Sequence, residues 1–160
     1  MGTYHSAQIC LNGHVITTSA DSDPDLCERF CSRCGAETTT ACRKCDAPIR
    51  GYYDAAGSVT VASSYSLPRF CHSCGQAYPW TAARLQAAAE LADELDDLSL
   101  EERELLKKSL AELVQDTPAA ELAAVRVKKA LRKVGAASVE TFRKVLVDVL
   151  SEAAKKSLGI

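Results

Sequence analysis

Six of the eight cysteines in this 160-residue chain form three Cys-x-x-Cys pairs, and these are the residues best suited to chemistry. The pairs are Cys31/Cys34, Cys42/Cys45 and Cys71/Cys74. Such a turn places two sulfurs on one edge of a tetrahedron, each about 2.3 Å from a Zn²⁺ ion. A glycine follows two of the pairs and allows the backbone conformation that a zinc knuckle needs. Three pairs within 44 residues therefore predict metal binding rather than free thiols or a redox pair.

Two closed tetrahedral sites need eight ligands, and the three pairs supply six of them. We assign the other two to Cys10 and His14, because the Asn12-Gly13 dipeptide between them favours a tight turn that faces both toward one ion. Cys27 is the competitor of His14, since it lies four residues before Cys31. The predicted ligands of two structural Zn²⁺ ions per chain are Cys10, His14, Cys31, Cys34, Cys42, Cys45, Cys71 and Cys74.

The spacing of the ligand pairs leaves three groupings open. The gaps between successive pairs are 16, 7 and 25 residues. We favour a nested grouping, in which the short gap lets the second and third pairs close one site and the first and fourth pairs form the other. A sequential grouping joins the first pair to the second and the third to the fourth. A crossed grouping joins the first to the third and the second to the fourth.

Four protein ligands per site are typical of structural zinc, whereas a catalytic zinc keeps one position open for water. His14 is followed by Val15 and Ile16, so the His-x-Glu element of nucleobase deaminases is missing. The sequence also shows no phosphate-binding loop, no HExxH motif and no Ser-His-Asp order. We therefore expect no catalytic residues and no enzymatic activity from this chain alone.

The elements that position the predicted ligands lie in residues 1–80, which hold every cysteine and histidine. Short β-prone runs occur at 14–18, 49–53 and 58–65, between Gly and Asp turn signals. A segment with so few large apolar residues needs a metal or a disulfide for stability. We predict a small β-rich zinc-ribbon or treble-clef-like domain with two structural zinc sites over residues 1–80.

Residues 81–160 are rich in Ala, Leu, Glu and Lys and predict an all-α four-helix bundle. Helices are expected over 81–96, 99–115, 117–135 and from 138 onward. Ser99 and Glu102 form a capping-box signature for the second helix. Thr117-Pro118 opens the third helix and Gly135 ends it.

Charge and composition restrict the partners. The chain is 25% charged and 47% hydrophobic, with a formal net charge of −2. No apolar run approaches the roughly 18 residues of a membrane span, and the first twenty residues lack a secretory signal. We therefore expect a soluble cytoplasmic protein that does not associate with membranes.

Nucleic-acid binding is disfavoured by the charge of the cysteine-containing half. Residues 1–80 contain six basic and seven acidic residues, and seven thiolates with two Zn²⁺ bring this half near −4. The helical half has one basic cluster, made of Arg126, Lys128, Lys129, Arg132 and Lys133. We interpret this cluster as a solvated helix face, with an anionic partner as the alternative. Homo-oligomerisation through the helical half stays open.

The sequence also resembles known families. Its Cys-x-x-Cys-Gly pairs resemble those of bacterial zinc-ribbon proteins. More narrowly, the segments 9–15, 48–51, 70–75 and 78–81, with sequences ICLNGHV, PIRG, FCHSCG and YPWT, resemble a bacterial family of unknown function over most of the chain. This resemblance implies a bacterial, cytoplasmic zinc-ribbon protein and supplies no activity. The pair count and the Cys10–His14 stretch are also similar to RING modules, but no cysteine follows His14 at the short spacing of those modules.

Together these patterns predict a non-catalytic zinc-binding adaptor or scaffold that mediates protein–protein interaction. One alternative is a RING-like E3-type factor in a bacterial ubiquitin-like conjugation pathway, which requires the crossed grouping. The other alternative is a nucleic-acid-binding zinc-ribbon regulator.

Overall fold

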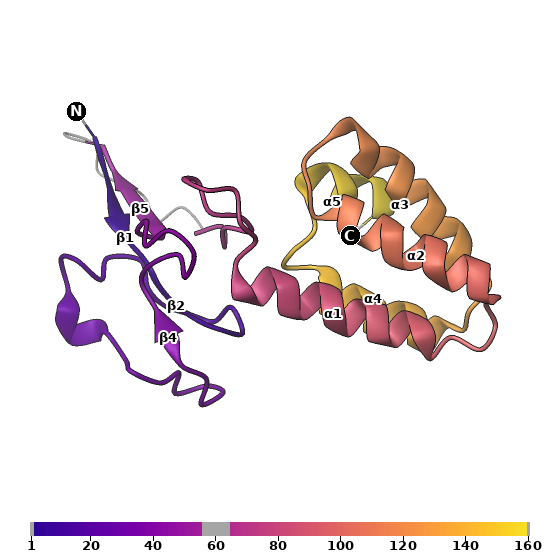
Figure 1. The fold of residues 1–160 in the computed structure, drawn as a ribbon, viewed down its shortest axis with the longest axis horizontal. Helices are drawn as coiled ribbons and strands as arrows, with labels where there is room; N and C mark the ends of the chain where they lie inside the picture. The colour runs from indigo at the N-terminus through magenta and orange to yellow at the C-terminus, as the bar shows by residue number, and fades with distance from the viewer. Residues whose placement is uncertain (1, 56–64, 160) are drawn as a thin grey trace. The chain divides into compact units, whose positions relative to one another are not determined.

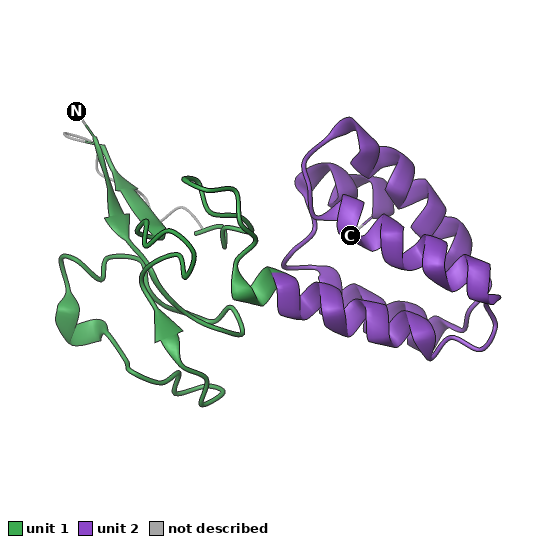
Figure 2. Ribbon diagram, in the orientation of Figure 1, with its two compact units in different colours: residues 1–81 green, residues 82–160 purple. Residues whose placement is uncertain are grey.

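The chain divides into two compact units in the structure, a computed structural model that describes residues 2–55 and 65–159. Unit 1 comprises Met1–Thr81 and unit 2 comprises Ala82–Ile160 (Figure 2). Unit 1 contains the strands and all the cysteines, and the helices extend from its last residues through unit 2. Each unit is described by itself below.

Two small antiparallel sheets form the β part of unit 1 (Figure 1). In the first sheet, β1 (Thr3–Ser6) pairs with β5 (Arg50–Asp54). In the second, β2 (Gln8–Cys10) lies between β3 (Val15–Thr17) and β4 (Thr38–Thr39). A single 3-10 turn, η1 (Pro24–Leu26), follows β3 in the chain. Strands of two to five residues are too short to stabilise a domain without further support.

The β-rich character predicted for this half is confirmed, although only some strands were anticipated. The predicted runs at 14–18 and 49–53 correspond to β3 and β5. Most of the third predicted run, residues 58–64, lies outside the described residues. Strands β1, β2 and β4 were not predicted, because such short segments become strands only through pairing with distant segments.

The core of unit 1 is small and includes cysteine side chains. Its buried cluster consists of Ala7, Ile9, Cys42, Ile49, Cys71, Tyr78 and Trp80. The Trp80 indole stacks on Tyr78 and donates a hydrogen bond of 2.8 Å to the Pro68 carbonyl. Gly51 of β5 passes so close to the chain after β3 that a Cβ atom there would lie 2.0 Å from the Thr18 carbonyl oxygen. This close approach explains why position 51 of β5 is a glycine.

Unit 2 is helical. Its helices are α1 (Pro79–Asp93), which begins in unit 1, α2 (Leu100–Leu113), α3 (Pro118–Leu131), α4 (Ala136–Leu146) and α5 (Glu152–Leu158). Helix α2 packs on α3, and α3 packs on α5. The Ser99–Glu102 capping box and the proline in the first turn of α3 are confirmed. No helix among the described residues is long and apolar enough to cross a bilayer.

The prediction of four helices was wrong, because the last predicted helix is broken in two. Helix α4 ends at Leu146, and Ser151 caps α5 by accepting a hydrogen bond from the Ala154 N–H at 3.1 Å. The Ser151 N–H donates to the Leu113 carbonyl, so the break is fixed by a contact with α2. It lets Val149 and Leu150 enter the core, where both are almost fully buried.

Candidate metal centres

The eight predicted ligands converge into two groups within unit 1. The first group is Cys10, His14, Cys31 and Cys34, and the second is Cys42, Cys45, Cys71 and Cys74. Within each group the sulfur and nitrogen ligand atoms all lie within 4.8 Å of one another. This is the sequential grouping, so the nested grouping that we favoured from the spacing was wrong.

Strand pairing explains why the short gap does not close a site. Strand β4 lies in the gap between the second and third pairs, and it pairs with β2 so that Cys10 faces Thr38. The Leu11 N–H donates to the Glu37 carbonyl at 3.0 Å and continues this pairing. This pairing holds the turn that begins at Cys10 against the Cys31–Cys34 knuckle. The residues between the second and third pairs form a strand of the sheet and do not close a metal site.

The Cys10–His14 turn joins β2 to β3 in the way that Asn12-Gly13 predicts. Gly13 has a φ of +88°, which is the left-handed region, and its N–H donates to the Cys10 carbonyl at 2.8 Å. The Cys10 N–H donates to the His14 carbonyl, and the His14 N–H donates to the Cys10 sulfur. The turn thus aims the Cys10 Sγ and the His14 Nδ1 at the same point, 3.5 Å apart.

The three Cys-x-x-Cys pairs form the same knuckle three times. In each, the residue after the second cysteine donates its N–H to the carbonyl of the first cysteine, at 2.7 to 2.9 Å. That residue is Gly35, Asp46 or Gly75, with φ values of +70°, +57° and +70°. The two glycines were expected from the sequence, whereas Asp46 in the equivalent position was not. Aspartate is one of the few residues that tolerate this conformation, which was the available signal.

The distances between ligand atoms match the edges of zinc tetrahedra. Zn–S bonds of about 2.3 Å at tetrahedral angles imply S···S edges of about 3.8 Å, and a Zn–N bond of about 2.0 Å implies S···N edges of about 3.5 Å. The S···S distances are 3.8 Å for Cys10–Cys34 and 3.7 Å for both Cys42–Cys74 and Cys45–Cys71. The His14 Nδ1 lies 3.6 Å from the Cys31 sulfur.

Donated hydrogen bonds favour thiolates in both groups. The Ala36 N–H, followed by the Asn12 side chain, lowers the pKa of Cys34 to about 6. The N–H groups of Cys74 and Ser73 lower the pKa of Cys71 to about 6. Thiolates are the form that binds zinc, so each group has a donor already suited to a cation.

Other thiols in the two groups resist ionisation. Burial raises the pKa of Cys10. The Ala47 N–H acts to lower the pKa of Cys45, but desolvation and the neighbouring thiols raise it to about 11. Crowded sulfurs repel a second negative charge, and a divalent cation at the centre would remove that conflict. The donor sets, three thiols with an imidazole and four thiols, therefore fit a soft divalent metal ion.

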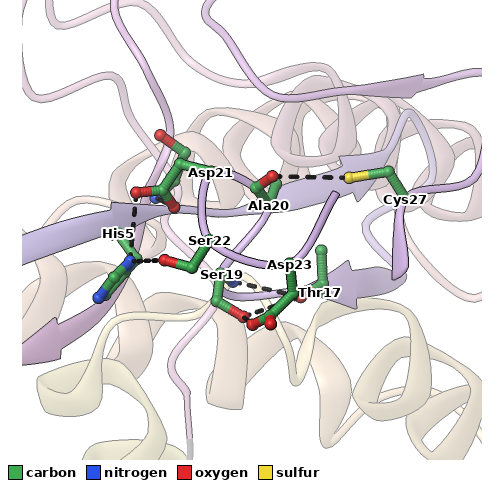
Figure 3. Close-up of polar contacts among 9 residues, drawn as sticks. His5, Thr17, Ser19, Ala20, Asp21, Ser22, Asp23 and Cys27 are labelled. Atoms are coloured by element: carbon green, nitrogen blue, oxygen red, sulfur yellow. Dashed lines mark hydrogen bonds and ion pairs between the residues drawn. The ribbon is translucent and has the colours of Figure 1, made fainter. Parts of the chain in front are cut away.

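Cys27 belongs to neither group. Its sulfur lies 4.0 Å from the Ala20 carbonyl, in the segment that surrounds η1 (Figure 3). His14 rather than Cys27 therefore completes the first group. His72 is exposed within the third knuckle and is not among the grouped residues.

A polar cluster that the sequence analysis did not anticipate brings a serine, a histidine and an aspartate together. Ser22 Oγ and Asp21 Oδ2 lie 2.7 Å and 3.2 Å from the His5 Nδ1. Figure 3 shows both contacts meeting at one ring nitrogen. A catalytic triad needs the serine and the aspartate on opposite nitrogens, so this arrangement cannot pass a proton from serine through histidine. The cluster instead ties β1 to the segment before η1.

Comparison with known proteins identifies the chain at the level of a family. The family model described as "Uncharacterized protein conserved in bacteria (DUF2321)" matches residues 3–158. No curated protein and no solved structure shows significant similarity to the chain. The chain, with its two Cys/His groups and its helical second unit, belongs to the bacterial family DUF2321.

Proposed function

We propose that unit 1 is a zinc-ribbon module with two structural Zn²⁺ ions, and that the protein is a non-catalytic adaptor acting in the reducing cytoplasm. The observation that carries the proposal is that each group has four protein donors at tetrahedral edge lengths. Four protein donors fill the coordination sphere of zinc and leave no position for a reacting water. None of the eight cysteines, all of which the structure describes, forms a disulfide, as expected in a reducing compartment.

The metal part of the proposal is tested by metal analysis of the purified chain. We expect two zinc ions per chain by mass spectrometry, and Co²⁺ substitution should give the intense visible bands of tetrahedral thiolate sites. A refolded chain that keeps the structure of unit 1 with no bound metal would contradict the proposal.

An exposed aromatic patch on the first sheet supports the adaptor part of the proposal. Tyr4 and Tyr53 face each other across β1 and β5 with ring centroids 4.8 Å apart, and about half of each residue is exposed. The Arg50 guanidinium lies 4.8 Å from the Tyr4 ring centre. Tyrosine and arginine are enriched among the residues that contribute most to protein–protein binding. We infer that this aromatic patch, Tyr4, Arg50 and Tyr53, contacts a protein partner.

Site-specific photocrosslinking in the bacterial host tests this surface. A photoreactive phenylalanine at position 53 should give one discrete crosslinked protein that resists nuclease treatment. Substituting Tyr4 with serine should abolish the crosslink and leave the zinc content at two. A photoreactive residue at exposed Val125 of unit 2 is the matched control and should not give the same product. Crosslinks to nucleic acid alone would instead support the regulator alternative.

The two alternatives receive less support. The crossed grouping that a RING-like factor requires differs from the grouping among the described residues. The charge near −4 argues against a phosphate-binding surface on unit 1. A gel shift at about 50 mM salt, where electrostatic binding is strong, tests the nucleic-acid alternative directly.

A further inference from the structure

A cavity in unit 2 combines apolar walls with positively charged residues. It has a volume of about 330 Å³, which is at the lower end of the range for small-molecule sites, about 300–1,000 Å³. Helices α3 and α4 provide most of its wall, and Leu158 of α5 adds to it. Val127, Phe142 and Leu146, all at most 3% exposed, form its apolar part. We call it the α3–α4 cavity.

The charge around this cavity has one sign. Lys128, Arg132 and Arg143 are exposed residues that also line it, and none of its lining residues in the described chain is acidic. Lys128 Nζ donates to the Ser157 carbonyl, so its charge is partly engaged at the end of α5. The guanidinium groups of Arg132 and Arg143 make no ion pair with any residue that the structure describes. Two guanidinium groups next to an apolar cavity are therefore available to an anion.

Stabilisation of the helix ends is the competing explanation for these charges. Basic residues in the last turn of a helix interact favourably with its dipole. Arg143 and Lys144 both lie in the last turn of α4, yet only Arg143 lines the cavity. The helix dipole therefore explains the positive charge at both positions equally well. Only the position of Arg143 beside the cavity distinguishes it from Lys144.

We propose that the α3–α4 cavity binds a single-chain aliphatic carboxylate, with the alkyl chain among Val127, Phe142 and Leu146 and the carboxylate on Arg132 and Arg143. Guanidinium is the side-chain group best matched to a carboxylate, because it donates two parallel hydrogen bonds. An amphipathic helix of a partner is a poorer fit, since it needs a groove for several side chains along its length. A cavity of this volume accommodates one flexible chain. The proposal is independent of the metal sites.

Calorimetric titration of the full, metal-loaded chain tests this inference. The probes are octanoate, decanoate and dodecanoate below their micellar concentrations, with decanol and decyltrimethylammonium for comparison. We expect one carboxylate per chain, and affinity rising about fourfold for each methylene until the cavity is full. Decanol should bind at least tenfold more weakly, because hydrogen bonds to a charged group are lost. Decyltrimethylammonium should not bind.

Variants of adjacent residues separate the cavity from general surface charge. Arg143→Gln should weaken decanoate binding about tenfold, whereas Lys144→Gln, the neighbouring control, should leave it unchanged. Val139→Trp, at a half-buried lining position, should fill the cavity and abolish binding while the helical circular dichroism is retained.

Three results would overturn the proposal. Equal binding of all three head groups, or an unchanged affinity for Arg143→Gln, would show adsorption without recognition. The third result is that no carboxylate binds, whereas an acidic amphipathic peptide does and Val139→Trp blocks that binding. This result would show that the cavity binds a protein segment.

Discussion

Unit 1 and unit 2 are similar in length but differ in what their cores contain. The buried cluster of unit 1 comprises seven of the described residues, and two of them, Cys42 and Cys71, are proposed metal ligands. Unit 2 buries Leu, Val, Ala and Phe side chains along its helices. In α2, for example, the buried residues Leu106, Leu110 and Leu113 lie on a single face of the helix. Apolar burial and helical hydrogen bonds can stabilise unit 2, whereas unit 1 has short strands and long turns. The difference supports the proposal that bound metal supplies in unit 1 the stability that apolar burial supplies in unit 2.

Metal removal should have the largest effect, and it should act on one unit only. Chelation is expected to unfold unit 1, because structural zinc contributes about 10–16 kcal/mol to folding and small domains are stable by about 5–15 kcal/mol. Unit 2 should keep its helices. Two-dimensional NMR would show loss of dispersed signals from residues 2–55 and 65–81 alone. Simultaneous loss of the helical circular dichroism would show that unit 2 also depends on the metal.

Single ligand substitutions should next resolve the two sites within unit 1. In the ¹¹³Cd-substituted chain we expect two NMR signals, one from an S₃N site and one from an S₄ site. Cys31→Ser should remove the S₃N signal and Cys71→Ser the S₄ signal, because the first belongs to the His14 group and the second does not. Cys27→Ser should leave both signals. Under the nested grouping, Cys31→Ser would instead remove the S₄ signal and Cys71→Ser the S₃N signal.

Gly51→Ala should destabilise unit 1 without removing any ligand. The added methyl group would lie 2.0 Å from the Thr18 carbonyl oxygen, so the backbone of β5 must move. We expect a loss of about 1–3 kcal/mol in the stability of unit 1, as for other overpacked sites. Gly135→Ala in unit 2 is the control, since nothing lies within 4 Å of its added Cβ. Thermal unfolding followed separately for the two units measures both. An equal shift in the two variants would exclude the steric explanation.

Asp46→Gly should strengthen the second knuckle. Asp46 has a φ of +57°, and glycine adopts this conformation without a Cβ penalty. We expect the zinc-loaded unit 1 to be stabilised by a few tenths of a kcal/mol up to about 1 kcal/mol. Release of zinc to a colorimetric chelator should slow accordingly. Faster release would show that the Asp46 carboxylate itself supports the knuckle.

The smallest effect should appear in unit 2 as a dependence on pH. The hydrogen bond from Lys133, followed by the Ser99 N–H, lowers the pKa of Glu102 below its ordinary value of 4.5. The ionised Glu102 therefore stabilises the folded helix above pH 4.5, and this contribution disappears as pH falls through the lowered pKa. Urea unfolding of unit 2 at pH 7 and pH 3 should show a smaller pH dependence for Glu102→Gln. Glu101→Gln should behave as the unmodified chain.

Local sequence patterns predicted the elements that depend on neighbouring residues. The Ser99–Glu102 capping box, Pro118 at the start of α3 and the tight turn at Asn12-Gly13 all act within a few residues. The Cys-x-x-Cys turns are local for the same reason. These features could be read directly because a side chain or a backbone conformation four residues away is sufficient to fix them.

Other features could not be predicted, because distant segments decide them. The break between α4 and α5 depends on the Ser151 N–H reaching the Leu113 carbonyl, 38 residues earlier. The α3–α4 cavity depends on how two amphipathic helices fit together, which the periodicity of each helix does not specify. The contact of Ser22 and Asp21 with one nitrogen of His5 likewise depends on folding of β1 against a later segment.

The amino-acid sequence alone identified the candidate donors, which are seven cysteines and a histidine in four closely spaced pairs. Which pairs share a site depends on the tertiary structure. Four pairs can be combined in three ways, and spacing favoured the nested way through its shortest gap. The pairing of β2 with β4 uses that gap as a strand and holds Cys10 and His14 on the first knuckle. Cross-strand hydrogen bonds between residues about 30 positions apart thus selected the grouping, and no local pattern encodes such bonds.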